Sequence, residues 1–218
     1  MAAETLTPEM LLVAYANGYF PMAMSKDDPE LYWFSPEERG VLPLETFHVP
    51  HGLKKVLKEG RFRLTVDAAF EEVIRACGTL TPERRETWIN EEIVQLYVAL
   101  FDMGFAHSVE VWLEEKLVGG LYGVSLGGAF FGESMFSRVP EASKVALVTL
   151  VELLREAGYQ LLDTQYVNDH LKQFGVEGWS KKRYRTKLEK ALSASPNPSS
   201  FFSTVSVRRG LASSSSER

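Results

Sequence analysis

The fold is decided by three consecutive segments, which read HSVEVWLEE at residues 107–115, KLVGGLYGVSLGG at 116–128 and AFFGESMFS at 129–137. Each segment is rich in β-branched and aromatic residues, and polar or glycine residues separate each one from the next. Short turns of this kind connect antiparallel neighbours. The sequence therefore predicts a three-stranded antiparallel meander in the centre of the chain.

A long helix and a fourth strand follow the meander. EASKVALVTLVELLREAG at residues 141–158 is apolar around most of its circumference, which indicates a helix packed deep against the sheet. YQLLDTQ at 159–165 reads as a strand. This order is that of an N-acetyltransferase-like fold, in which a splayed mixed sheet with flanking helices holds an activated acyl group. We therefore expect the α/β class (α+β in detail) with that architecture.

The chain divides into three parts. Residues 1–62 are expected to form a small N-terminal lobe, within which residues 19–43 are rich in proline, glycine and aromatic residues and read as loops and short strands. Residues 63–192 are expected to form the N-acetyltransferase-like catalytic domain. Residues 193–218 are dominated by serine and other polar residues, so they bury little apolar surface, and a disordered tail is expected.

Helix starts can be located by their capping residues. Thr7 is expected to cap a first helix with Pro8 at its first position. Asp67, which follows a strand at 63–66, is expected to cap a helix that runs to Cys77. Further helices are expected after Asn90, around 167–175 and after Ser180.

Composition indicates an ordinary globular protein. The 218 residues are 45% hydrophobic, enough for one sizeable core. The single cysteine, Cys77, cannot form an internal disulfide, and no spaced Cys/His set predicts a zinc site. The sequence has neither a signal-peptide pattern at its start nor a run of about 18 apolar residues, so we expect a cytoplasmic protein that does not enter the membrane.

Charge must be examined locally because the net charge is −5. That balance argues against a protein covered with positive charge, although local patches can still bind phosphates. One basic cluster consists of Lys54, Lys55, Lys58, Arg61 and Arg63, and a second lies between Lys181 and Lys187. On charge alone, a solvated helix face is the simpler interpretation of both clusters.

Several collinear blocks make this chain resemble the leucyl/phenylalanyl-tRNA–protein transferases. They are YANGYFPM at residues 15–22, WFSPEERGVL at 33–42, TWI at 87–89, AHSVEVW at 106–112, LVGGLYGV at 117–124, FFGESMFS at 130–137 and LLDTQYVNDHL at 161–171. The N-terminus is short beside many members, and the serine-rich tail has no recognised counterpart. Both departures lie away from the expected chemistry.

The resemblance implies a reaction and its partners. Leucine or phenylalanine, and less readily methionine, would pass from aminoacyl-tRNA to the N-terminal Lys or Arg of acceptor proteins, which marks them for N-degron degradation. The ester of the donor is already activated, so no covalent enzyme intermediate, ATP, metal or other cofactor is implied. The acceptor amine, with an ordinary pKa of about 7.7–8.0, must lose a proton before it attacks. A monomer is expected.

Three polar residues are the expected catalytic group. Asp163 and Gln165 are two residues apart in a strand, so their side chains project from the same face. By resemblance, Asp163 orients Gln165, Asn168 hydrogen-bonds the substrate, and Glu133 is a substrate-binding carboxylate. For isolated residues, helix capping by Asp163 and Asn168 and a paired core carboxylate at Glu133 would be the alternatives.

Other residues are expected to bind the donor. An apolar pocket for the amino acid is predicted from Leu121, Phe131, Met135, Leu150, Leu154 and Leu162, although their spacing also suits an ordinary core. By resemblance, Trp33, Phe34 and Trp88 stack around the terminal adenosine, the alternative being a plug between lobes. The basic cluster of Lys54, Lys55, Lys58, Arg61 and Arg63 would contact tRNA phosphates.

Three other functions have some support in the sequence. Gly123 to Gly127 matches G-x-S-x-G around Ser125, and Asp163 and His170 follow in the chain order of a serine esterase. That motif requires a strand-to-helix turn, whereas a strand is expected after Ser125. An N-acetyltransferase that uses an acyl-thioester would present glycines before the long helix, where this chain has SRVPEASK. A pure binding module would not explain the grouped polar residues.

Overall fold

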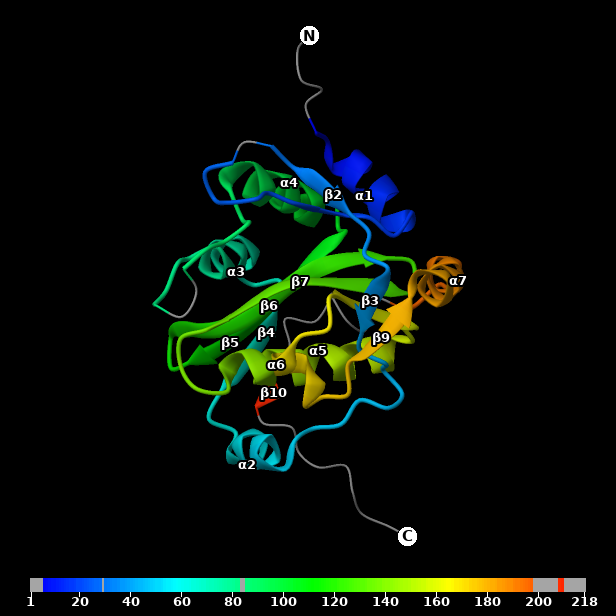
Figure 1. Ribbon diagram of the computed structural model, residues 1–218. Helices are drawn as coiled ribbons and strands as arrows, with labels where there is room; N and C mark the ends of the chain where they lie inside the picture. The colour runs from blue at the N-terminus through cyan, green and yellow to red at the C-terminus, as the bar shows by residue number, and fades with distance from the viewer. Residues whose placement is uncertain (1–5, 29, 83–84, 198–207, 210–218) are drawn as a thin grey trace.

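The computed structural model describes residues 6–28, 30–82, 85–197 and 208–209 (Figure 1). Its centre is an eight-stranded mixed sheet in the order β10-β4-β5-β6-β7-β8-β3-β9. The bounds are β3 Glu38–Val41, β4 Arg63–Val66, β5 Ala106–Leu113, β6 Lys116–Leu126, β7 Ala129–Ser137, β8 Leu161–Gln165, β9 Glu177–Ser180 and β10 Arg208–Arg209. β1 (Phe20–Met22) and β2 (Tyr32–Phe34) form a separate hairpin.

Helices cover both faces of the sheet (Figure 1). One apolar cluster contains buried side chains of α1, α3, α4 and α7, and a second contains those of α2, α5 and α6. Neighbouring strand residues alternate between the two clusters, as Phe130 and Phe131 do, because successive side chains point to opposite faces. The helix bounds are α1 Pro8–Ala16, α2 His51–Glu59, α3 Phe70–Cys77, α4 Glu91–Asp102, α5 Ala142–Ala157, α6 Asp169–Lys172 and α7 Lys181–Leu192.

The expected α/β class, meander and splayed sheet are confirmed. β5, β6 and β7 pair antiparallel, and α5 then connects β7 to the parallel strand β8. β7 and β8 pair only where residues 129–131 face residues 161–163. From Gly132 onward the two strands diverge, so the sheet opens beside the second half of β7.

Capping residues start three of the expected helices. Thr7 accepts a hydrogen bond from the backbone N–H of Met10, and Asn90 accepts one from Ile93. Ser180 does the same for α7, since its hydroxyl accepts from the N–H of Arg183.

The expectation that Asp67 caps α3 is wrong. Asp67 has a φ of 56°, and Ala69 occupies the N-cap position. Its carboxylate instead accepts the N–H of Ser108 and contacts the ring of His107, both at 2.8 Å. The carboxylate is therefore used to join β4 to β5.

The boundary of the N-terminal lobe also differs from the expected one. Residues 38–41, expected within the lobe of residues 1–62, form β3 and lie between β8 and β9 of the main sheet. The lobe is thus continuous with the catalytic sheet. Of the expected tail, residues 198–207 and 210–218 lie outside the described residues, whereas Arg208–Arg209 pair with β4.

Across the residues that the structure describes, none of the helices has both the length and the apolar character needed to cross a membrane.

Candidate active site

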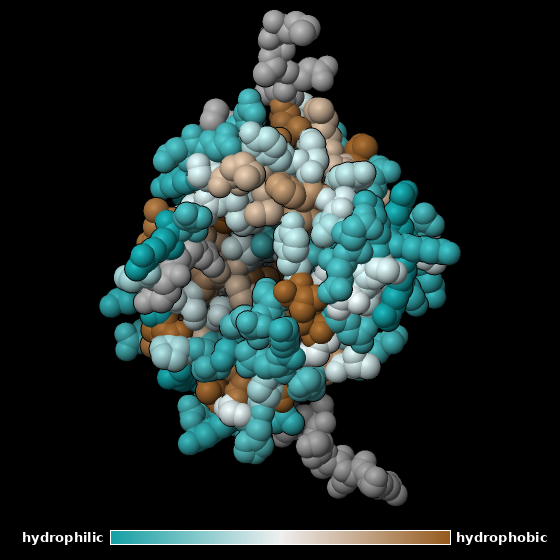
Figure 2. All heavy atoms as spheres, in the orientation of Figure 1, coloured by the Kyte–Doolittle hydropathy of each residue, from teal (hydrophilic) through white to brown (hydrophobic). Residues whose placement is uncertain are grey.

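A cavity of about 980 Å³ lies where β7 diverges from β8. Its walls come from β6, β7, β8, the β7–α5 loop, α5 and the segment around α6. The face of the molecule drawn in Figure 2 is hollowed near its centre, with apolar side chains visible at depth. The splayed sheet therefore produces the cavity.

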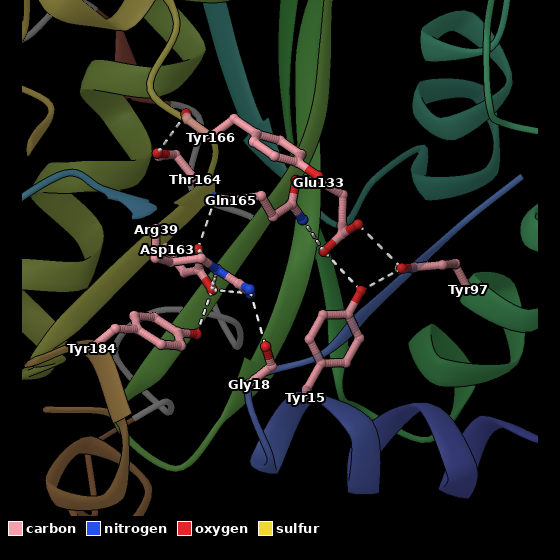
Figure 3. Close-up of polar contacts among 10 residues, drawn as sticks. All are labelled: Tyr15, Gly18, Arg39, Tyr97, Glu133, Asp163, Thr164, Gln165, Tyr166 and Tyr184. Carbon is pink, nitrogen blue, oxygen red and sulfur yellow. Dashed lines mark hydrogen bonds and ion pairs between the residues drawn. The ribbon is translucent and has the colours of Figure 1, made fainter. Parts of the chain in front are cut away.

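Glu133 of β7 lines this cavity and is 9% exposed. Its Oε1 accepts hydrogen bonds from the Tyr15 hydroxyl at 2.8 Å and from Gln165 Nε2 at 2.9 Å (Figure 3). Its Oε2 accepts from the Tyr97 hydroxyl at 3.1 Å. These donors come from α1, α4 and β8, so three separate parts of the chain converge on one carboxylate.

Burial raises the pKa of the Glu133 carboxyl to about 7, and the negative charge of Asp163 adds to the rise while hydrogen bonds from Tyr15, Tyr97 and Gln165 oppose it. The Tyr15 and Tyr97 hydroxyls also contact each other. A carboxyl group with a pKa of about 7 is close to half-protonated at neutral pH. Near neutral pH this group therefore exchanges readily between its two forms.

Asp163 of β8 is surrounded by donors. The Arg39 guanidinium contacts both carboxylate oxygens, with Nη2 at 2.7 Å from Oδ2 and Nε at 2.9 Å from Oδ1. Oδ2 also accepts from the Tyr184 hydroxyl at 2.6 Å, and Oδ1 accepts from the backbone N–H of Gln165 at 2.8 Å. Asp163 is 0% exposed, and it does not line the cavity.

Arg39 is held as firmly as its partner. Its Nη1 donates to the carbonyl of Gly18 at 3.0 Å, and its guanidinium lies over the rings of Phe20 and Tyr184. Such contacts on both faces and along the edge suit the planar guanidinium. The ion pair therefore ties the N-terminal lobe to the end of β8.

Gln165 connects the two carboxylates. Its backbone N–H bonds to Asp163 and its side chain bonds to Glu133. Its φ is 61°, a left-handed conformation that L-residues other than glycine adopt at a cost. The bond to Asp163 holds the turn from which the Gln165 side chain extends.

Four of the six predicted pocket residues line the cavity: Leu121, Met135, Leu150 and Leu162. The other two do not, which corrects the prediction. Phe131 packs on the ring of Tyr15 in the core of the opposite face, and Leu154 of α5 is fully buried in the second apolar cluster. Phe131 follows Phe130 on a strand, and the sequence alone does not reveal which of the two lies on the side of the sheet that α5 covers.

Asn168 lines the cavity and also caps α6, where its Oδ1 accepts the N–H of Leu171 at 2.9 Å. Capping was the alternative interpretation of this residue. The cap fixes the side chain at the cavity wall, so the two roles are compatible.

The three predicted adenosine-stacking residues lie outside the cavity. Trp33 on β2 is 40% exposed, and Phe34 stacks on Phe20 at 6.0 Å. Phe34 and Trp88 both pack against the first apolar cluster, which fits the expected plug between lobes as well as a stacking surface. Only Trp33 of the three is exposed to this degree.

The predicted tRNA-binding residues form one surface on and after α2. Lys54, Lys55 and Lys58 are exposed on the helix. Arg61 donates to the carbonyl of Pro140, which belongs to the loop that lines the cavity, and Arg63 lies over the ring of Trp112. The basic surface thus reaches the cavity rim.

Sequence reasoning misses Arg39, Tyr15, Tyr97 and Tyr184. Tyr15 and Arg39 lie within the blocks that carry the resemblance, so their position in those blocks is the available signal. Tyr97 repeats with helical spacing among apolar residues and reads as core. Their roles depend on contacts across 21 to 124 residues of chain, which no local pattern contains.

The serine esterase motif lacks its structural context. Ser125 lies inside β6, which turns directly into β7 rather than into a helix. Its hydroxyl pairs with that of Tyr159 at 2.7 Å. A nucleophile elbow requires a strand-to-helix turn, so this motif is not one.

A mixed sheet that opens onto an apolar cavity beside a carboxyl group with a pKa near neutrality is the arrangement of an acyl-transferring enzyme. Comparison with known proteins narrows this class. The family model described as leucyl/phenylalanyl-tRNA protein transferase matches residues 41–189, and that of the N-terminal domain of the same family matches residues 4–37. The chain belongs to the leucyl/phenylalanyl-tRNA–protein transferase family, and it is an aminoacyltransferase.

Individual relatives agree with the family. Leucyl/phenylalanyl-tRNA–protein transferase from Paramagnetospirillum magneticum is 59% identical over 187 residues, which cover 86% of this chain and 90% of that one. The protein of the same name from Rhodospirillum rubrum is 53% identical over 188 residues, covering 86% and 88%. Among solved structures, L-PGS from Bacillus licheniformis aligns with 84% of this chain and 70% of its own, at 12% identity and a TM-score of 0.44.

Proposed function

We propose that this aminoacyltransferase moves leucine or phenylalanine, and less readily methionine, from aminoacyl-tRNA to the N-terminal Lys or Arg of acceptor proteins. The observation that carries the proposal is the bond between Glu133 and Gln165 at the end of an apolar cavity. A carboxyl group with a pKa of about 7 can accept the proton of an attacking amine near neutral pH.

The cavity supports an apolar donor. Leu121, Leu150 and Leu162 line it together with the flexible side chain of Met135, and these groups can adapt to branched or aromatic side chains. These four side chains offer no hydrogen-bond partner, so a polar donor side chain placed against them would lose hydrogen bonds on entry. Selection among leucine, phenylalanine and methionine then depends on shape.

The reaction balances without any further reagent. The neutral α-amine of the acceptor attacks the ester carbonyl carbon, a C–N bond forms, and the C–O bond to the terminal ribose breaks. The proton leaves the amine for Glu133, and Glu133 gives it to the ribose oxygen when that oxygen departs. Glu133 thereby returns to its starting state, and one ester is exchanged for one peptide bond.

Asp163 acts through Gln165 in this proposal. Its oxygens are occupied by Arg39, Tyr184 and the N–H of Gln165, so it is a positioning residue rather than a proton acceptor. Gln165 then offers its side chain to the reacting groups. Asn168, fixed by its capping bond, hydrogen-bonds the substrate at the opposite wall.

The tRNA is held in two ways in this proposal. Trp33, Phe34 and Trp88 stack on the terminal adenosine, since aromatic side chains are the usual surface for an unpaired base. Lys54, Lys55, Lys58, Arg61 and Arg63 contact backbone phosphates, which suits an enzyme that accepts several tRNAs. The hydrogen bond from Arg61 to Pro140 supports a continuous path from these phosphates to the cavity.

The physiological part of the proposal rests on the family. Acceptors that receive leucine or phenylalanine are directed to N-degron degradation, and the enzyme works as a monomer in the cytoplasm without a metal or other cofactor.

The test is transfer of label from radiolabelled leucyl-tRNA to a short peptide that begins with Arg. The matched control is the same peptide with an acetylated N-terminus, which has no free amine. Label in the first peptide and none in the second is the expected result. Release of free leucine without labelled peptide would contradict the proposal and favour hydrolysis.

A second arm of this experiment examines the basic surface. Substitution of Lys54, Lys55 and Lys58 by Ala should raise KM for leucyl-tRNA and flatten its salt dependence by roughly one log–log unit for each phosphate that is no longer bound. Leucyl-adenosine, which has no tRNA body, should react as before. Equal damage with both donors would show that α2 supports the fold instead.

A further inference from the structure

Tyr166 follows Gln165 directly and has no part in the site described so far. It is 43% exposed, which is unusual for an aromatic side chain beside a buried polar centre. In Figure 3 its ring points the same way as the Gln165 side chain, toward Glu133. Unlike Glu133, Tyr166 does not line the cavity.

The backbone at Tyr166 is held in place by a close approach to β3. A Cβ atom on Gly40 would lie 2.4 Å from the carbonyl carbon and oxygen of Tyr166, so only glycine at that position allows the two segments to come together. The N–H of Tyr166 also bonds to the carbonyl of Thr164 at 2.6 Å, across the left-handed Gln165.

The ring is held as well. It meets the ring of Phe20 edge-on, with centroids 5.7 Å apart and an angle of 88° between planes. Phe20 is fully buried and lies beneath the Arg39 guanidinium. An exposed ring is therefore oriented by the same cluster that positions Gln165, and one face of the ring remains available to a ligand.

We propose that Tyr166 forms the subsite for the cationic side chain of the acceptor's first residue, which lies over the tyrosine ring in a cation–π contact. This inference rests on the proposed function. The α-carbon of the first residue is bonded to the attacking nitrogen, so its side chain must leave the reaction centre along the surface next to Gln165. The long stems of Lys and Arg carry the charge to a ring that a short side chain would not reach.

Because the ring is exposed but does not line the cavity, it is better suited to the acceptor than to the donor amino acid. The donor side chain enters the apolar cavity, which Glu133 lines and Tyr166 does not. The acceptor must approach the bond between Gln165 and Glu133 from the other side. A tyrosine there attracts a cation without a negative charge that would also bind the amine and keep it protonated.

The experiment combines two enzymes with two acceptors. Wild-type protein and Tyr166→Leu are compared on peptides that begin with Lys or with norleucine, which has the same stem and no charge. A partly exposed cation–π contact is worth about 0.5–2 kcal/mol, so kcat/KM for the Lys peptide should fall by about 2- to 30-fold in Tyr166→Leu. The norleucine peptide should change little, and Tyr166→Phe should keep the wild-type preference.

Several outcomes would overturn the inference. An equal fall in kcat/KM for both peptides would mean that the ring only packs. If Tyr166→Leu raised KM for leucyl-adenosine and left the preference for Lys unchanged, the ring would bind the adenosine instead. If Tyr166→Phe lost the preference for Lys, the hydroxyl rather than the ring would be responsible. Tyr166→Met removes the ring in the same way should Tyr166→Leu not fold. Absence of transfer to either peptide by the wild-type protein would contradict the proposed function itself.

Discussion

Two buried carboxylates lie on neighbouring strands, and their surroundings are opposite. Asp163 on β8 is paired with a guanidinium that is itself buried, and a hydroxyl and a backbone N–H complete its bonds. Glu133 on β7 has three neutral donors and no cationic partner among the hydrogen bonds and ion pairs of the described residues. Burial penalises a charge in both places, but only Asp163 has a counter-charge within contact distance.

Because their surroundings differ, Asp163 and Glu133 have different roles in the proposed reaction. A carboxylate that is fully paired holds a geometry, and here it holds the turn at Gln165. A carboxyl group whose pKa is raised to about 7 by burial can exchange a proton during the reaction. Gln165 hydrogen-bonds to both carboxyl groups. Asp163 therefore fixes the position of the side chain that contacts Glu133.

The largest effect is expected from removing the charge of Glu133. Glu133→Gln keeps the size of the side chain but cannot accept a proton, so kcat/KM for leucine transfer should fall by about 10²- to 10⁴-fold. Glu110→Gln is the matched control, because Glu110 is also a fully buried carboxyl group whose pKa is raised by burial, on β5 and away from the cavity. A Glu133→Gln enzyme within tenfold of the wild-type rate would show that the two carboxylates do not divide the chemistry in this way.

The second effect concerns stability. Asp163→Ala leaves the buried guanidinium of Arg39 unpaired, which should lower the free energy of unfolding by roughly 3–5 kcal/mol. Replacing both partners, as in Arg39→Met with Asp163→Leu, removes the buried charge and should recover much of that loss. Urea unfolding of the three proteins measures both quantities.

The recovery of stability in the double variant shows whether the cost of Asp163→Ala comes from the unpaired charge of Arg39. Its transfer rate shows whether the ion pair is needed to position Gln165. A double variant that is stable yet slow in transfer would match a positioning role, since the bond to the Gln165 N–H is absent from it. A double variant no more stable than Asp163→Ala would show that packing around the pair, not the unpaired charge, sets the cost.

The local parts of the fold could be predicted from sequence, and the parts set by distant contacts could not. The meander, α5 and β8 follow from hydrophobic periodicity and turn residues. β3 reads Glu-Arg-Gly-Val and β9 reads Glu-Gly-Trp-Ser, neither of which alternates as a strand does. These segments become strands because they pair with each other and β3 pairs with β8.

Within the site, too, local features could be predicted from the sequence and those set by distant contacts could not. Asp163 and Gln165 could be paired from their spacing, but the left-handed φ of Gln165 is a product of the bulge between β3 and β8. Arg39 is 124 residues from Asp163 in the sequence, so no local pattern pairs them. A charged residue in an irregular segment is expected to be exposed, and the burial of Arg39 could therefore not be predicted. Leu162 lines the cavity and Phe131 does not. Phe130 and Phe131 are adjacent and both apolar, so the sequence pattern does not show which face of the sheet either one occupies.

The smallest effect is the dependence of stability on pH that Glu133 should produce. In the unfolded chain a glutamate has a pKa of about 4.3, and in the folded protein burial raises the pKa of Glu133 to about 7. Between these values the folded state holds a proton that the unfolded state has released. The contribution of Glu133 to stability is therefore fully present below about pH 4.3 and is lost as pH rises through about 7, a difference of roughly 4 kcal/mol.

Other carboxyl groups titrate over the same range, so the contribution of Glu133 must be isolated by difference. The free energy of unfolding of wild-type protein minus that of Glu133→Gln, measured from pH 4.5 to 8, cancels the groups that the two proteins share. The difference should decline with rising pH and become flat above about pH 7.5, because the amide introduced by the substitution does not titrate in this range. A difference that rises with pH would mean that Glu133 is stabilised in its ionised form, and the contrast with Asp163 would then disappear.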